Sequence, residues 1–225
     1  AQLFFDQNIF ENMLEWLYET IDYFIKIDKI LVIRAHPAEI SGTLPSKQKI
    51  YDEIKKKYGS LPKNIIFIAP EDPTSSYSII EKSKFCIVYG STIGTEIAAM
   101  GKNVLVGGEA WIKNKEISYD PRSKLEYFQL ISKLILSSKM SIERYKRAKK
   151  YAYHFFFKRM IPVNLIETKK EKYQDFIIEK KNIKKIFPLE DYDKGIQTIC
   201  DSVLYDKNFI YEESVSYTHL TLPTT

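Results

Sequence analysis

The chain has 225 residues, of which 44% are hydrophobic and 28% are charged, a balance typical of a globular protein with a sizeable core. No apolar run is long enough to span a bilayer and no signal peptide is evident, so we expect a cytoplasmic protein. The net charge of +5 comes with lysines that are spread among acidic residues and concentrate mainly after Lys139, which favours an ordinary solvated surface over nucleic-acid binding. It is also compatible with peripheral contact at the inner face of a membrane.

The first half of the chain alternates between helical and strand patterns. Helices are predicted over 7–27, 47–58, 77–83 and 91–101, and strands over 30–35, 64–69, 85–89 and 103–106. This alternation indicates an α/β fold with a Rossmann-like, doubly wound parallel sheet. Ligands bind such sheets beyond the carboxyl ends of the strands.

The strand pattern fades after Gly108. Helices are predicted over 124–137, 141–159 and 190–204, whereas the charged stretch 168–185 has no clear pattern. Two cysteines, Cys86 in a strand and Cys200 in a helix, are interpreted as small core residues and not as a disulfide or a metal pair.

Both ends of the chain are interpreted as unusual. Residues 1–214 do not begin with Met and open almost directly into a helix, so we expect a fragment that forms one α/β domain with carboxyl-terminal helices. Residues 215–225 read VSYTHLTLPTT, which resembles a translated sequencing adapter and is interpreted as an artefact.

Five of the eight glycines fall between Gly90 and Gly108, in a strand-turn-helix-strand pattern. We expect the hydroxyl of Ser91 or Thr92 to cap the helix, while backbone N–H groups and the positive end of the helix dipole face outward. Such an end favours an anion, typically a phosphate. Glu96, one turn further, can accept hydrogen bonds from sugar hydroxyls such as those of a ribose; the alternative is that it only complements the helix dipole.

Polar turns follow three of the predicted strands. Arg34 and His36 leave the same side of the first strand, where His36 can donate a hydrogen bond to a phosphate and Arg34 can supply charge. The loop 70–77 follows the second strand, and the turn 90–92 follows the third. Because the carboxyl ends of parallel strands meet at one edge, we expect the three turns to converge on one crevice.

These motifs together resemble a known family. His36-Pro37, SSYSIIEKS over 75–83 and YGSTIGTEIAAMGKNVLVGG over 89–108 are similar to the carboxyl-terminal domain of capsule-polysaccharide and surface-carbohydrate biosynthesis glycosyltransferases. This bacterial group has the two-domain GT-B architecture and includes Kdo transferases and sialyltransferases. The resemblance implies a donor-nucleotide domain that binds a CMP-activated sugar, for capsule or surface polysaccharide synthesis.

The resemblance also implies roles for particular residues. His36, Ser91 and Thr92 would contact the phosphate, and Glu96 the ribose. The full substrate-binding set is Arg34, His36, Pro37, Ser76, Tyr77, Gly90, Ser91, Thr92 and Glu96. The expected partners are a nucleotide-sugar donor and a glycan or glycolipid acceptor, with no nucleic acid. No cofactor and no metal are expected, since no DxD-type motif is evident in the predicted crevice.

The catalytic base is not identified from the sequence. In inverting members of the family it usually comes from the amino-terminal acceptor domain, which we expect to be missing from this fragment. Glu71 and Asp72 are loop carboxylates in the right neighbourhood, although solvated turn residues are the commoner case. The alternative functions are a nucleotide-sugar epimerase, a polyol-phosphate transferase of related fold, and a non-catalytic carbohydrate-assembly protein.

Overall fold

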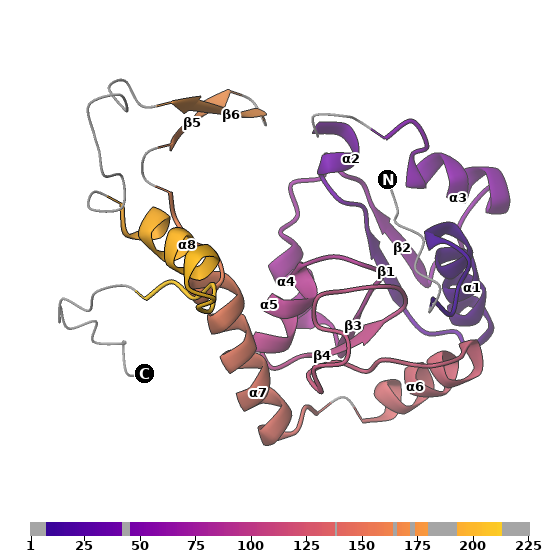
Figure 1. Cartoon of the computed structure of the whole chain (residues 1–225). Helices are drawn as coiled ribbons and strands as arrows, with labels where there is room; N and C mark the ends of the chain where they lie inside the picture. Colours follow the sequence, from indigo (N-terminus) through magenta and orange to yellow (C-terminus); the bar gives the residue numbers. More distant parts are fainter. Residues whose placement is uncertain are drawn as a thin grey trace, which may run out of the picture. The chain divides into compact units, whose positions relative to one another are not determined.

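The computed structural model describes residues 8–41, 46–137, 139–163, 166–171, 174–179 and 193–212 (Figure 1). Contacts between Cα atoms divide the chain into two compact units, Ala1–Ala152 with Lys170–Gln174 and Tyr153–Lys169 with Asp175–Thr225. All of the residues predicted to bind substrate belong to the first unit. The segment 215–225, interpreted as an artefact, lies outside the described residues.

The first unit is mixed α/β. Its elements are α1 (Met13–Lys26), β1 (Leu31–Arg34), α2 (Ala38–Ser41), α3 (Ile50–Tyr58), β2 (Ile65–Ile68), α4 (Ser76–Lys82), β3 (Phe85–Val88), α5 (Ile93–Ala99), β4 (Asn103–Val106), α6 (Lys124–Leu136) and nearly all of α7 (Ile142–Tyr153). Every element predicted from the sequence up to residue 106 is present, and β4 has the predicted bounds. The short helix α2 was not predicted.

The strands form parallel pairs. β1 lies parallel to β2 with Leu31 opposite Ile65, and β3 lies parallel to β4 with Phe85 opposite Asn103. Among the described residues no ladder of hydrogen bonds joins β1 to β3, so the expected continuous doubly wound sheet is observed only as these two parallel pairs. Tyr119 extends the second pair, because its backbone exchanges hydrogen bonds with Val104 and Val106 of β4.

The pair β3–β4 is covered on both faces. Val104 and Val106 pack in a cluster with residues of α4, α5 and α7, whereas Leu105 packs with residues of α1 and α6. All four residues of β4 are buried. This alternation is what two-sided burial of a parallel strand requires, and it accounts for the continuous apolar run of β4 after Asn103.

The pair β1–β2 has only one face packed against helices. Leu31, Ile33 and Phe67 contact the core cluster that α1 and α3 form around Ile21. On the other face Ile66 is 45% exposed. Together with Ile68 of β2 and with Val32 and Arg34 of β1, it lines a cavity. A parallel pair is normally buried on both faces, so this open face is the exception in the fold.

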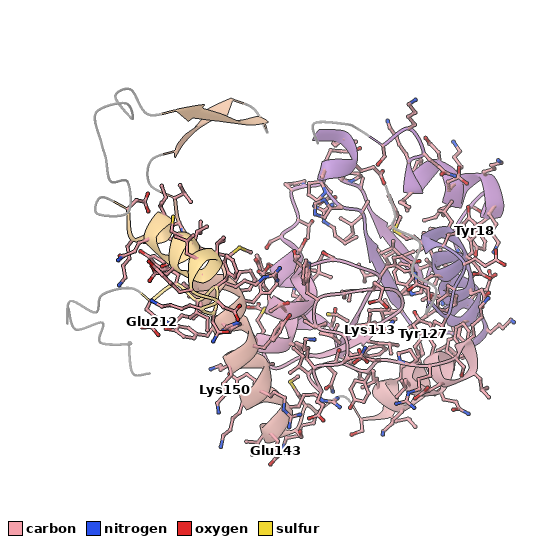
Figure 2. The ribbon with its side chains drawn as sticks, viewed as in Figure 1. Tyr18, Lys113, Tyr127, Glu143, Lys150 and Glu212 are labelled. Carbon is pink, nitrogen blue, oxygen red and sulfur yellow. The ribbon has the colours of Figure 1, made fainter. Side chains whose placement is uncertain are left out.

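Buried polar contacts join α1 to α6. The indole Nε1 of Trp16 donates to the hydroxyl of Tyr127 at 2.8 Å, and the hydroxyls of Thr20 and Tyr127 are hydrogen-bonded at 2.9 Å. In Figure 2 the labelled Tyr127 lies where α6 meets α1. The same indole covers Gly107, where an added Cβ would lie 2.1 Å from Nε1. A glycine is therefore required at the end of β4.

The remainder of the chain departs from the sequence prediction in three ways. The strands β5 (Ile166–Glu171) and β6 (Gln174–Glu179) pair in the charged stretch that showed no pattern. The helix predicted over 141–159 is α7 followed by the π-helix η1 (His154–Lys158), and α8 (Lys194–Leu204) begins four residues later than predicted. Both cysteines are free thiols of intermediate burial: Cys86 packs against the core cluster around β4, but neither is the fully buried core residue that was expected.

Within the described ranges no helix combines the length and the apolar composition that a membrane crossing needs.

Candidate functional site

A cavity of about 1890 Å³ is lined by β1, β2 and β3 and by the turns that follow β1 and β3. Its volume exceeds the roughly 300–1,000 Å³ of typical small-molecule sites. Eight of the nine residues predicted to bind substrate line it, namely Arg34, His36, Pro37, Ser76, Gly90, Ser91, Thr92 and Glu96. The convergence expected from the sequence is therefore present for the turns after β1 and β3 and for the start of α4.

His36 is held by the short helix that follows it. Its Nδ1 accepts a hydrogen bond from the backbone N–H of Ala38 at 3.0 Å, and its carbonyl accepts from Glu39 N at 2.9 Å. Because Nδ1 is an acceptor here, the proton of the neutral ring resides on Nε2. The exposed imidazole is thus fixed with a donor available at Nε2.

Arg34 is engaged with the loop after β2. Its Nη1 donates to the carbonyl of Ala69, and its Nη2 donates to the carbonyl of Asp72 at 3.1 Å. Its Nε is buried without a hydrogen-bond partner. Arg34 therefore ties the end of β1 to the loop 69–72, and what it offers at the cavity is charge more than free donors.

The start of α5 differs from the predicted cap. Thr92 occupies the N-cap position but makes no side-chain cap hydrogen bond, because its backbone is already helical at φ −64° and ψ −22°. Ser91 Oγ accepts from the N–H of Ile93 at 3.4 Å, a long contact. The Thr92 side chain is exposed at the cavity, so its hydroxyl remains free to meet a ligand.

Glu96 and Tyr77 are joined by a close hydrogen bond. The hydroxyl of Tyr77, on α4, donates to Oε2 of Glu96, on α5. This bond raises the pKa of Tyr77, so the phenol stays protonated as the donor. Tyr77 is the one predicted residue that does not line the cavity, and it reaches the site through Glu96.

Two glycines allow close approach of the turns around the cavity. A Cβ on Gly90 would lie 2.8 Å from the carbonyl oxygen of Glu109, and one on Gly108 would lie 2.8 Å from the carbonyl oxygen of Tyr89. The turns after β3 and β4 therefore pack backbone against backbone. This contact brings Glu109 to the cavity wall, where it forms an ion pair with Lys113.

The cavity carboxylates are not the loop residues considered from the sequence. Glu71 and Asp72 do not line it. Asp72 Oδ1 accepts from Thr74 N at 2.8 Å in a turn, and this hydrogen bond lowers its pKa. Besides Glu96, the carboxylates at the cavity include those of Glu39 and Glu109, which sequence reasoning missed. Glu39 lies two residues after His36-Pro37, and Glu109 directly follows the glycine pair Gly107-Gly108.

Among the described residues, no three His, Cys, Asp or Glu side chains are grouped closely enough to hold a metal ion.

Comparison of the chain with protein-family models, with curated proteins and with solved structures finds no match.

Proposed function

We propose that the first unit is the donor-nucleotide domain of a glycosyltransferase that uses a CMP-activated sugar for capsule or surface polysaccharide synthesis. The main support is the cavity, which is lined by His36, Thr92 and Glu96 from separate turns and helices. Parallel strand pairs with ligand-facing turns at their carboxyl ends are compatible with one half of a Rossmann-like GT-B fold. The sequence resemblance supplies the family.

The side chains at the cavity match the two ends of a nucleoside phosphate. The Nε2 donor of His36 and the hydroxyl of Thr92 are suited to phosphate oxygens, which accept hydrogen bonds only. The carboxylate of Glu96 accepts only, and suits the ribose hydroxyls. The volume of about 1890 Å³ leaves room for the sugar carried by the phosphate.

In this proposal the unit contributes to catalysis by positioning. Donors fixed around the phosphate stabilise the charge that develops on the leaving group as the glycosidic bond to it breaks. In the family that the sequence resembles, the base that activates the acceptor hydroxyl belongs to the acceptor-binding domain, so we assign no base within this chain. The acceptor is a glycan or glycolipid, and the reaction is cytoplasmic, at the inner membrane face.

Calorimetric titration of the full chain with CMP, CDP, UMP, UDP and free sugars tests the proposal. We expect binding of the cytidine nucleotides in preference to the uridine nucleotides, and no binding of free sugars, because the phosphate supplies the charged contacts. Failure of all four nucleotides to bind would overturn the proposed function. Tighter binding of uridine nucleotides would reject the CMP-sugar assignment while keeping a nucleotide site.

A further inference from the structure

The pair formed by Tyr77 and Glu96 carries an inference that rests on the proposed function and deepens it. The two side chains come from different helices, 19 residues apart in the chain, and meet through one hydrogen bond. Glu96 is partly exposed and lines the cavity, while the ring of Tyr77 is 49% exposed and lies outside it. The hydroxyl of Tyr77 therefore donates its hydrogen bond to the carboxylate of Glu96 and does not face the cavity.

The hydrogen bond from Tyr77 makes the two carboxylate oxygens of Glu96 inequivalent. Oε2 accepts from Tyr77, and within the described ranges Oε1 has no protein partner. A glutamate without such an anchor rotates about three side-chain bonds and loses that freedom when it binds a ligand. A carboxylate already anchored at one oxygen presents the other at lower entropic cost.

We propose that Tyr77 is a positioning residue for ribose recognition: its hydroxyl anchors Oε2 of Glu96 so that Oε1 accepts a hydrogen bond from a ribose hydroxyl. Tyr77 touches neither the phosphate nor the base. Its removal weakens binding only to ligands that carry the hydroxyl read by Glu96. The pair therefore determines the preference for ribonucleotides over deoxyribonucleotides.

The test compares CMP with 2′-deoxy-CMP on wild type, Tyr77→Phe and Glu96→Gln by calorimetry. Tyr77→Phe keeps the ring and removes the hydroxyl. We expect it to weaken CMP binding about three- to tenfold and to leave 2′-deoxy-CMP binding unchanged. Glu96→Gln is also expected to reduce the preference for CMP over 2′-deoxy-CMP. The double variant should lose no more of this preference than Glu96→Gln alone, because Tyr77 acts only through the carboxylate of Glu96.

Tyr51→Phe is the matched control, since Tyr51 is also an exposed tyrosine of the first unit but does not line the cavity. It is expected to leave both affinities unchanged. If Glu96→Gln abolishes the preference for CMP and Tyr77→Phe keeps it in full, the positioning role is rejected and the proposed function stands. If wild type binds neither nucleotide, both proposals fail. Equal weakening of both ligands by Tyr77→Phe would mark Tyr77 as merely structural and also reject its role.

Discussion

The indole of Trp16 and the phenol of Tyr127 meet in the core of the first unit, with Nε1 of Trp16 donating to the Tyr127 hydroxyl at 2.8 Å. Tyr127 is fully buried, and its hydroxyl is also hydrogen-bonded to Thr20. The phenolic oxygen of Tyr127, on α6, is therefore hydrogen-bonded to two side chains of α1, those of Trp16 and Thr20. The same indole packs against Gly107, two residues before the cavity residue Glu109.

Tyr127→Phe should lower the free energy of unfolding by about 1–3 kcal/mol, because it leaves the Trp16 N–H without its acceptor in a partly buried setting. Urea denaturation measures this loss. The control Tyr51→Phe, at an exposed tyrosine, should change stability by less than about 0.5 kcal/mol. A loss below that limit for Tyr127→Phe would mean that the buried hydroxyl contributes nothing net.

Stability should fall in acid through the carboxylate of Glu15. The hydrogen bond from Lys124 lowers the pKa of Glu15 in the folded chain below its unfolded value. A lowered pKa means that this contribution is complete above the unfolded pKa and is lost as the pH falls through the folded one. Unfolding by urea at pH 7 and at pH 3 should therefore show a smaller difference for Glu15→Gln than for wild type.

The ion pairs of Lys124 with Glu15 and Glu19 should also lose their contribution to stability at high pH. The carboxylates of Glu15 and Glu19 raise the pKa of Lys124, so its contribution is lost as the pH rises through that raised value. Glu71→Gln, at an exposed loop residue, is the control and should stay within about 0.5 kcal/mol of wild type at neutral pH. An unchanged pH dependence in Glu15→Gln would show that the pair adds no stability.

Cys86 should react slowly with alkylating reagents. Burial raises the pKa of its thiol to about 11, so only about one thousandth of it is thiolate at pH 8. In a Cys200→Ser background, iodoacetamide labelling followed by mass spectrometry should accelerate about tenfold per pH unit between pH 7.5 and 9.5. A rate that levels off within this range would contradict the raised pKa, provided that circular dichroism shows an intact fold.

His36→Asn is designed to separate phosphate binding from local structure. The Asn oxygen can still accept from the Ala38 N–H two residues on, as Nδ1 of His36 does, but the Nε2 donor is lost. CMP affinity should fall by roughly ten- to a hundredfold, since a hydrogen bond to a charged phosphate is removed. Calorimetry and thermal denaturation measure both effects.

His154→Asn, at an exposed histidine of the second unit, is the matched control and should leave CMP affinity unchanged. Unchanged affinity in His36→Asn with a lower melting temperature would assign His36 to the α2 turn alone.

The sequence was most informative where strands are short, apolar and bounded by glycine. β4 was predicted at its observed bounds because Gly101 and Gly107 enclose it, and the residues lining the cavity were predicted because they follow strand ends. α2 was missed because four residues are too few to show a helical period. β5 was missed because most of its residues are charged and have low strand propensity. β6 was missed because its apolar run, 176–178, is only three residues long.

Contacts between distant residues could not be predicted in the same way. The Tyr77–Glu96 hydrogen bond depends on how α4 and α5 are arranged, and no local period encodes this. That no ladder joins β1 to β3 in the part of the chain that the structure describes likewise depends on packing and not on strand propensity. The Thr92 cap was predicted from residue preference, but the backbone at Thr92 is helical and the hydroxyl forms no cap.

The division of the strands into two parallel pairs also has a consequence for the order of folding. Each pair closes its own chain loop, from Phe85 to Asn103 in one and from Leu31 to Ile65 in the other. The loop between β1 and β2 is nearly twice as long, which raises the free-energy cost of closing it by about 0.6 kcal/mol. Because neither pair needs the other's ladder, we expect β3–β4 to assemble first and β1–β2 to dock later. Pulsed hydrogen exchange during refolding should then protect the amides of β4 before those of β2.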